Sequence, residues 1–331
     1  MKAVVVARPG GPEVLELRDV PGPETVADRV RVRVVASGVN RADVLQRRGG
    51  YPAPPGWPDD IPGLEFSGVV ENVGPECRLR KPGDRVMGLV GGGGYAEYVV
   101  VDERETVTVP EALDLVAAGA VPEAFMTAFD AVHLQMGLTA GETLLIHAVG
   151  SGVGTAALQL ARVAGARTLG TSRTPEKLER ARALGLDVAV EGGGEDWPDR
   201  VMEATGGRGV DVVLDLVGAP YVSGNLEVLA PRGRWIVVGV PGGGVAKMDL
   251  RRLMGKRATL TGTLLRSRPR EEKAALARAF ESRVAPLFGR GLLEPVVDEV
   301  HPAREAAAVH RRMEANLNFG KLVLRWDAPN P

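Results

Sequence analysis

Residues 143–157 read Thr-Leu-Leu-Ile-His-Ala-Val-Gly-Ser-Gly-Val-Gly-Thr-Ala-Ala, an apolar run that leads directly into a glycine turn. Gly152, Gly154 and Ala157 fit the G-x-G-x-x-G/A pattern, in which the glycines permit a tight turn and close approach of a phosphate. We predict a strand at 143–147, a helix at 155–164 and a second strand at 167–171. This arrangement predicts a dinucleotide pyrophosphate held by amide N–H groups and by the positive end of the helix.

The type of nucleotide is indicated at the end of the second strand, where NAD-binding chains carry an acidic residue that bonds the ribose 2′-hydroxyl. This chain reads Ser172-Arg173-Thr174 there, and Lys177 follows in the next turn. A hydroxyl, a guanidinium and an ammonium can all bond a 2′-phosphate, which a carboxylate would repel. We therefore predict NADP(H) as the cofactor. The alternative is that Arg173 and Lys177 are solvated charges at the start of a helix.

The remaining sequence falls into two regions with different residue patterns. Residues 1–110 carry short β-branched runs between Gly/Pro clusters, which is typical of a β-rich domain. From about residue 123 helices and strands alternate, with a helix at 124–135 and further strands at 210–216, 234–240 and 258–263. This alternation predicts an α/β fold with a doubly wound parallel sheet. A last strand at 321–325 has no obvious partner in that sheet, so we expect the tail to return to the first domain. The predicted domains are 1–122 with 266–331, and 123–265.

Three further loops follow apolar strands, at 215–218, 238–240 and 263–265. Ligands in open α/β sheets bind beyond the carboxyl ends of strands, near the point where the strand order reverses. This shared position predicts cofactor contacts from Val217, Gly218, Gly239 and Leu264, although each loop taken alone would be structural.

The composition argues against several classes of function. The 331 residues carry a net charge of −1 and no run of five basic residues, so we expect neither strong nucleic-acid binding nor attraction to an anionic membrane. Cys77 is the only cysteine, which excludes an internal disulfide and a Cys-based zinc site. No apolar window approaches 18 residues, and the first apolar run is too short for a signal peptide. We expect a cytoplasmic protein.

No metal site or catalytic triad is apparent in the sequence. The four histidines are scattered, and we expect His147 to cap a strand end. Ser151 is flanked by glycines at one residue rather than two, which does not fit a nucleophile elbow, and its hydroxyl is expected to bond a phosphate. A reductase in which the cofactor carries the hydride needs only binding, orientation and a dry pocket from the protein.

Several motifs in one order resemble the medium-chain dehydrogenase/reductase superfamily, and within it the zinc-free quinone oxidoreductases related to zeta-crystallin. The resemblance covers nearly the whole chain and rests on the segments at 37–43, 49–51, 62–68, 83–86, 92–98, 149–157 and 313–321. The segment at 264–267 is similar to the subgroup of the mammalian tumour-suppressor-induced quinone oxidoreductase. The resemblance implies a Rossmann NADP(H)-binding domain and a β-rich, GroES-like substrate domain.

The same resemblance implies that there is no catalytic zinc ion. Asn40 stands where alcohol dehydrogenases of the superfamily carry a ligand cysteine, and Leu64 stands where they carry a ligand histidine. The lobe with four cysteines is also missing. Alcohol oxidation through a zinc-bound alkoxide is therefore not expected.

The resemblance further implies roles for individual residues. Asn40, Tyr51 and Thr127 would face the nicotinamide, and Tyr51 would also touch the quinone; the alternative for Tyr51 is a loop aromatic packed among prolines. The other implied contacts are with the pyrophosphate (Gly150, Ser151, Gly152, Val153 and Gly154), with the 2′-phosphate (Ser172, Arg173 and Lys177) and with the nicotinamide side (Leu264, Asn316, Asn318 and Lys321). Glu191 departs from the pattern, because the family usually has a tyrosine near this position, and its carboxylate would oppose a 2′-phosphate if it pointed inward.

The leading hypothesis is an NADPH-dependent reductase that passes hydride to a quinone or a similar electrophilic enone. A reductase of 2-enoyl thioesters or alkenals on the same scaffold is an alternative that the sequence does not separate from it. A non-enzymatic NADPH-binding or RNA-associated protein is a third. The resemblance also implies a homodimer, or a tetramer, with the dimer formed through the edge strand at 258–263.

Overall fold

The computed structural model describes residues 1–327, which form two compact units. Within the described residues, unit 1 comprises 1–126 and 265–327, and unit 2 comprises Thr127–Leu264. None of the helices within residues 1–327 is long and apolar enough to cross a membrane.

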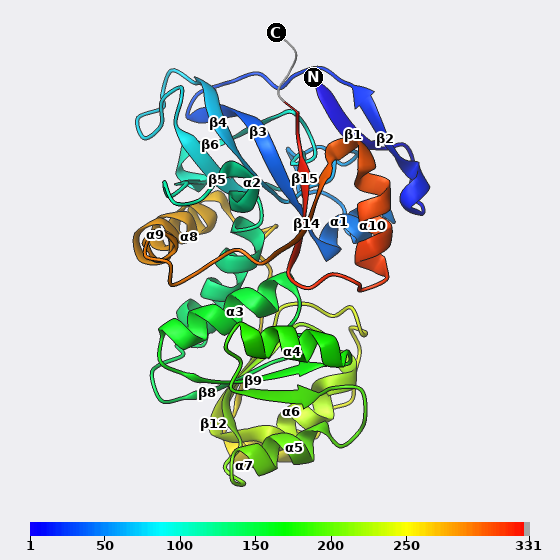
Figure 1. The fold of residues 1–331 in the computed structure, drawn as a ribbon, viewed down its shortest axis with the longest axis vertical. Coiled ribbons are helices and arrows are strands. Elements are labelled where there is room, and N and C mark those ends of the chain that lie inside the picture. Colours follow the sequence, from blue (N-terminus) through cyan, green and yellow to red (C-terminus); the bar gives the residue numbers. More distant parts are fainter. Residues whose placement is uncertain (328–331) are drawn as a thin grey trace. The chain divides into compact units, whose positions relative to one another are not determined.

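Unit 2 is built on a parallel sheet with the strand order β10-β9-β8-β11-β12-β13. Helices α3 and α4 cover one face of this sheet, and α5, α6 and α7 cover the other (Figure 1). The elements are β8 (Thr143–Ile146), α3 (Gly152–Val163), β9 (Arg167–Ser172), α4 (Pro175–Ala183), β10 (Val188–Glu191), α5 (Trp197–Ala204), β11 (Val210–Asp215), α6 (Val222–Val228), β12 (Leu229–Val237), α7 (Leu250–Lys256) and β13 (Thr259–Gly262). The predicted doubly wound α/β sheet is confirmed, and its strand order reverses between β8 and β11.

The turn between β8 and α3 follows from its sequence. Leu144, Leu145 and Ile146 are completely buried, as expected for a strand covered on both faces. Helix α3 begins at Gly152 and is capped by Ser151, whose Oγ accepts a hydrogen bond from the Gly154 amide. A Cβ at Gly154 would lie 2.6 Å from the carbonyl oxygen of Ala148, so the turn itself requires glycine at this position.

Unit 1 contains a mixed sheet with the order β14-β15-β3-β4-β5-β7, and β6 also pairs with β3. A separate hairpin pairs β1 with β2. The strands are β1 (Lys2–Val6), β2 (Leu15–Asp19), β3 (Arg29–Val39), β4 (Glu65–Val73), β5 (Arg85–Leu89), β6 (Tyr98–Asp102), β7 (Thr106–Thr108), β14 (Val297–Pro302) and β15 (Lys321–Arg325). Strand β15 pairs with β3, which confirms that the tail returns to the first part of the chain.

Strand β3 shows why the central strand of this sheet forms. Its valines at 30, 32 and 34 are buried, whereas its arginines at 29, 31 and 33 are only partly buried on the other face. This alternation matches the two-residue period of a strand with one core-facing side.

The helices of unit 1 are α1 (Arg41–Arg47), α2 (Leu115–Ala118), α8 (Arg270–Arg283), α9 (Ala285–Gly289) and α10 (Ala306–Glu314). Helix α1 lies within the region that the sequence presented as β-rich. The Asp43 carboxylate accepts a hydrogen bond from the Asn40 amide at 2.8 Å, so a local cap explains a helix that strand periodicity does not reveal. The predicted helix at 124–135 is also different: two wider π-helical segments, η3 (Pro122–Met126) and η4 (Phe129–Gln135), take its place.

A buried network of hydrogen-bonded side chains links α10 to α1 in unit 1. The Tyr95 hydroxyl lies 3.0 Å from Asp43 Oδ2 and 3.2 Å from His310 Nε2, and Arg47 Nη1 lies 3.3 Å from His310 Nδ1. Because arginine only donates, His310 Nδ1 accepts and its Nε2–H donates to Tyr95, whose hydroxyl then donates to Asp43. Burial, with a smaller contribution from the Arg47 charge, lowers the pKa of His310 to about 3. The imidazole is therefore neutral at physiological pH.

Candidate active site

The glycine turn of unit 2 presents backbone donors at the start of α3. Ser151 accepts the hydrogen bond from the Gly154 amide, whereas the amides of Gly152 and Val153 have no acceptor within residues 1–327. Ala148, just before the turn, has a positive φ of 50°, which is uncommon for a residue with a Cβ. Unused amides at a helix N-terminus suit an anion such as a pyrophosphate.

The end of β9 supplies a hydroxyl and two cationic side chains. Ser172 is buried, and its Oγ accepts a hydrogen bond from the Thr174 amide at 3.1 Å. Arg173 is exposed and Lys177 is partly buried at the start of α4. On the neighbouring strand Glu191 is in register with Ser172, but its side chain is 57% exposed and lies 3.9 Å from Arg200. Solvent and Arg200 both weaken its repulsion toward an anion at Ser172.

The loop after β11 is held by a residue whose role the sequence did not show. Asp215 is completely buried, and its Oδ1 accepts hydrogen bonds from the amides of Val217 at 2.9 Å and Gly218 at 2.8 Å. Gly218 has a φ of +91°, a conformation that glycine adopts without strain. The conformation of the predicted 217–218 contact is thus fixed by a carboxylate two to three residues earlier.

His147 is linked to Asp215 through Asn225, whose Nδ2 donates to Asp215 Oδ2 at 3.1 Å. Its Nδ1 lies 2.9 Å from Thr171 Oγ1 and its Nε2 lies 2.6 Å from Asn225 Oδ1. Its side chain is completely buried, and burial lowers its pKa. The imidazole links the ends of β8 and β9 to α6, in line with the prediction of a structural role at a strand end.

Thr127 is notable among the predicted nicotinamide contacts in unit 2. It is buried, and its Oγ1 has no hydrogen-bond partner within the described part of the chain. An unsatisfied buried hydroxyl costs about 1–3 kcal/mol. A ligand with a polar group, such as a nicotinamide carboxamide, would satisfy it. Of the other predicted contacts in unit 2, Gly239 is partly buried and Leu264 is 57% exposed.

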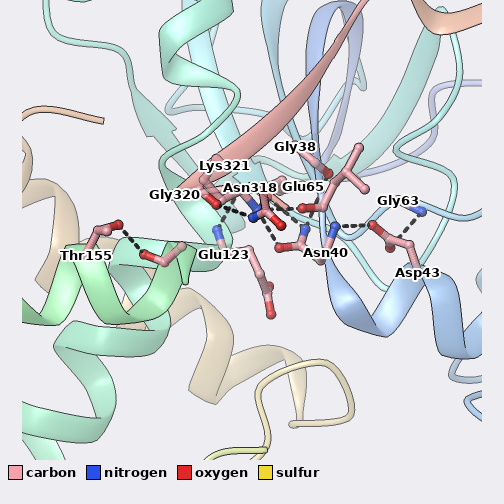
Figure 2. Close-up of polar contacts among 12 residues, drawn as sticks. Gly38, Asn40, Asp43, Gly63, Glu65, Glu123, Thr155, Asn318, Gly320 and Lys321 are labelled. Atoms are coloured by element: carbon pink, nitrogen blue, oxygen red, sulfur yellow. Dashed lines mark hydrogen bonds and ion pairs between the residues drawn. The ribbon is translucent and has the colours of Figure 1, made fainter. Parts of the chain in front are cut away.

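A buried cation occupies the centre of the candidate site in unit 1 (Figure 2). The Lys321 ammonium lies 2.6 Å from Glu65 Oε1 and also donates to Asn40 Oδ1 and to the Val39 carbonyl oxygen at 3.1 Å. Asn40 Nδ2 in turn donates to Glu65 Oε1 at 2.8 Å. Lys321 and Glu65 are almost inaccessible to solvent, at 5% and 0% of the side chain. The three N–H bonds of the ammonium are all used inside the protein.

The structure thus brings together Asn40 and Lys321, for which the family resemblance implied separate nicotinamide contacts. The other two tail residues shape the approach to β15. Asn318 is buried and donates to the Gly320 carbonyl oxygen at 2.8 Å, while Asn316 has a φ of +55° and accepts from Arg41 at 2.6 Å.

A small pocket in unit 1 has an apolar wall with charged groups beside it. The lining residues are Leu64, Leu89, Val90, Glu123, Leu265, Arg266 and Lys273. Arg266 is buried and donates to the carbonyl oxygens of Gly91 at 2.8 Å and Tyr51 at 2.9 Å. Its guanidinium also lies 4.8 Å from the centroid of the Tyr51 ring. Tyr51 therefore contacts a pocket-lining cation, and burial raises the pKa of its hydroxyl.

Sequence reasoning did not single out Glu123 or Arg266. The signal for Glu123 is a lone acidic residue in the otherwise apolar run at 115–126. Arg266 lies in the 264–267 segment that carried the family resemblance, but nothing local indicated that its side chain reaches Tyr51, 215 residues earlier.

Histidine, cysteine and carboxylate side chains do not gather into a metal site anywhere in residues 1–327. The buried position between Asn40 and Glu65 instead holds the ammonium of Lys321.

Comparison with known proteins identifies the family. The model of the alcohol dehydrogenase GroES-like domain matches residues 26–111, and the model of zinc-binding dehydrogenases matches residues 152–281. A quinone oxidoreductase of Pseudomonas aeruginosa is 35% identical over 328 residues, which cover 98% of this chain and 99% of that protein. The chain belongs to the medium-chain dehydrogenase/reductase superfamily.

Solved structures of the superfamily agree with this assignment. A crystal structure of an NAD-dependent alcohol dehydrogenase is 35% identical with a TM-score of 0.88, covering 98% of this chain and 99% of its own. A mycobacterial protein solved in complex with NADPH is 29% identical with a TM-score of 0.86, covering 98% of this chain and 100% of its own. These likenesses confirm the predicted fold class, with a GroES-like part and a nucleotide-binding part.

Proposed function

We propose that this chain is an NADPH-dependent quinone oxidoreductase. The observation that carries the proposal is the pair of unused amides at the start of α3, together with a strand end that offers Ser172 and basic side chains where NAD-binding chains have a carboxylate. The likeness to the quinone oxidoreductase of Pseudomonas aeruginosa supports the substrate class, and the likeness to a protein solved with NADPH supports the cofactor.

The residues present fit NADP(H). The nicotinamide supplies a hydride when the cofactor is bound. We assign the pyrophosphate to Gly150–Gly154 and the 2′-phosphate to Ser172, Arg173 and Lys177, while the loops with Val217, Gly218, Gly239 and Leu264 border the ribose. Thr127 and Tyr51 would face the nicotinamide. The tail residues Asn316, Asn318 and Lys321, with Asn40, would act on that side by fixing the shape of unit 1.

We also propose that catalysis is independent of zinc. The support is the cluster of Lys321, Glu65 and Asn40, in which an ammonium already neutralises the carboxylate and bonds the Asn40 side chain. A metal ion at this position would have to displace a buried cation that has three hydrogen bonds inside the protein.

We propose a homodimer formed through β13. This strand is at an edge of the unit 2 sheet, and unpaired edge strands are ready sites for pairing with a second copy. Leu260 on β13 and Met254 on α7 are exposed apolar side chains, at 38% and 74%. A cytoplasmic location completes the proposal and rests on the sequence.

The test is NADPH oxidation against ortho-quinones, para-quinones, enals and enoyl thioesters, with NADH in parallel and with and without EDTA. Turnover of quinones that prefers NADPH and is indifferent to EDTA supports the proposal. Turnover confined to enals or enoyl thioesters would transfer the assignment to enoyl reduction. Binding of NADPH without any turnover would favour a non-enzymatic protein.

A further inference from the structure

Glu123 is a partly buried acid of unit 1 whose carboxyl group makes no hydrogen bond or ion pair within the part of the chain that the structure describes. Its backbone amide donates to Glu65 Oε2 at 2.8 Å, and its side chain points away from the Lys321 cluster (Figure 2). No hydrogen bond or ion pair within residues 1–327 reaches that side chain. Glu65, by contrast, is bonded by Lys321, Asn40 and the Glu123 amide.

Glu123 lines the pocket described above, together with four apolar residues and the two cations Arg266 and Lys273. The segment that carries it, η3, is π-helical, a rare backbone form that often marks functional sites. The side chain is only partly buried, so water can reach it and exchange its proton. An unpartnered acid in such a pocket is placed to act on a ligand.

We propose that Glu123 is the proton donor of the reaction, delivering a proton to the oxygen of the reduced quinone. This inference rests on the proposed function. Transfer of a hydride, with its two electrons, to the quinone gives a hydroquinone monoanion. The Glu123 O–H bond then breaks as a new O–H bond forms on that oxygen, and the resulting carboxylate regains a proton from water.

The charges around Glu123 suit this role. Burial, and then the Glu65 carboxylate, raise the pKa of Glu123 to about 8, which leaves it a neutral acid at physiological pH. The other charged groups that act on it are Lys321, Asp43 and Arg266, and Lys273 lines the same pocket. Lys273 is already paired with Glu105 at 2.8 Å, and Lys321 with Glu65. Arg266 donates to two carbonyl oxygens and to Gln46 Oε1 at 2.6 Å, but no carboxylate within residues 1–327 pairs with it, so its charge is left to stabilise an anionic product in the pocket.

The first test compares the wild type with Glu123→Gln, which preserves shape but has no proton to give. Because Glu123 is active when protonated, wild-type kcat/KM should fall as pH rises through about 8, and this alkaline limb should be absent in E123Q. General acid catalysis contributes about 100-fold or more, so E123Q should lose about that factor at neutral pH with quinones whose reduced anions are strongly basic. Tetrachlorobenzoquinone, whose reduced anion is weakly basic, should lose much less. The matched control is Glu76→Gln, the same substitution at an exposed glutamate.

An equal loss for all quinones, or an unchanged alkaline limb, would show that Glu123 is only structural and would overturn the inference. Glu123→Asp should restore part of the rate and the alkaline limb. If the wild type reduced no quinone at all, the proposed function would fail instead, so the two failures are distinct.

A binding measurement tests the same inference without turnover. The wild type with NADP⁺ bound should hold 4-nitrophenolate, an unreactive mimic of the anionic product, less tightly as pH rises through about 8, since ionised Glu123 repels it. In E123Q the affinity for the phenolate should not change across this range. The same pH dependence in both proteins would contradict the assignment. Because this measurement needs no turnover, it applies even if E123Q is too unstable for kinetics.

Discussion

Replacing Lys321 with methionine should destabilise unit 1 strongly, because it leaves the Glu65 carboxylate buried without its counter-charge. The ammonium lies 2.6 Å from Glu65 Oε1, and the two side chains are 5% and 0% exposed, so water cannot take over the role of the lysine. Removing one partner of a buried ion pair typically costs about 3–5 kcal/mol. For a unit of this size each kcal/mol lowers Tm by roughly 2–4 °C, so Tm should fall by roughly 6–20 °C.

The assays are urea denaturation, which gives the free energy of unfolding, and thermal denaturation, which gives Tm, both followed by circular dichroism and by tryptophan fluorescence. Trp326 follows β15 directly and donates to Ser37 Oγ at 3.0 Å, so it reports on the same unit. Lys2→Met is the control, because Lys2 and Asp19 form a pair that is 52% and 79% exposed. Such surface pairs contribute about 0–1 kcal/mol.

A double-mutant cycle separates lost charge from lost packing. Glu65→Gln combined with Lys321→Met removes both charges, while the carboxamide oxygen introduced at position 65 can still accept from the Glu123 amide. The double variant should be less destabilised than Lys321→Met alone, since no uncompensated charge remains. The reasoning would be refuted if Lys321→Met cost no more than Lys2→Met, or if the two changes at 65 and 321 were simply additive.

Three further outcomes are expected. Tyr51→Ala should lower kcat/KM for quinones with unchanged circular dichroism, and an unchanged kcat/KM would exclude a role in binding the quinone. Ser172→Asp should weaken NADPH binding by about 1.5–3 kcal/mol, roughly 10- to 150-fold, and spare NADH; titration of both cofactors would reject the 2′-phosphate assignment if they suffered alike. His310→Gln should reduce the loss of stability on acidification, measured by urea denaturation between pH 6.5 and 3. Because the pKa of His310 is lowered to about 3, the unfolded state binds more protons than the folded state in this range, and the free energy of unfolding falls by up to about 1.4 kcal/mol for each pH unit of acidification. The pKa of Asp43 is raised to about 6, so between pH 6 and 3.8 this group has the opposite effect on the free energy of unfolding. Identical pH slopes in the two proteins would contradict the histidine argument.

The fold of unit 2 was largely predictable because its signals are local. A strand such as β8, buried on both faces, is a continuous apolar run, and the Ser151 cap lies beside the glycines that form the turn. Helix α1 and the π-helical segments were not predicted. The former depends on the Asn40–Asp43 cap, and the latter differ from an α-helix by a backbone pairing that leaves no mark on side-chain periodicity.

The site in unit 1 depends instead on contacts between distant residues. The family resemblance implies, one residue at a time, that Asn40 and Leu64 replace zinc ligands, but the partner of Glu65 is a lysine 256 residues further along the chain. Two ligands lost to polar and apolar residues would leave a buried carboxylate without a cation, a costly arrangement. Lys321 supplies that cation, so the position retains a positive charge although its chemistry differs. An ammonium held by three hydrogen bonds cannot bind a substrate oxygen as a metal ion with an open position would. Under the proposed function the activation of the substrate comes from elsewhere in the pocket, and the proposal assigns it to the proton of Glu123 and the charge of Arg266.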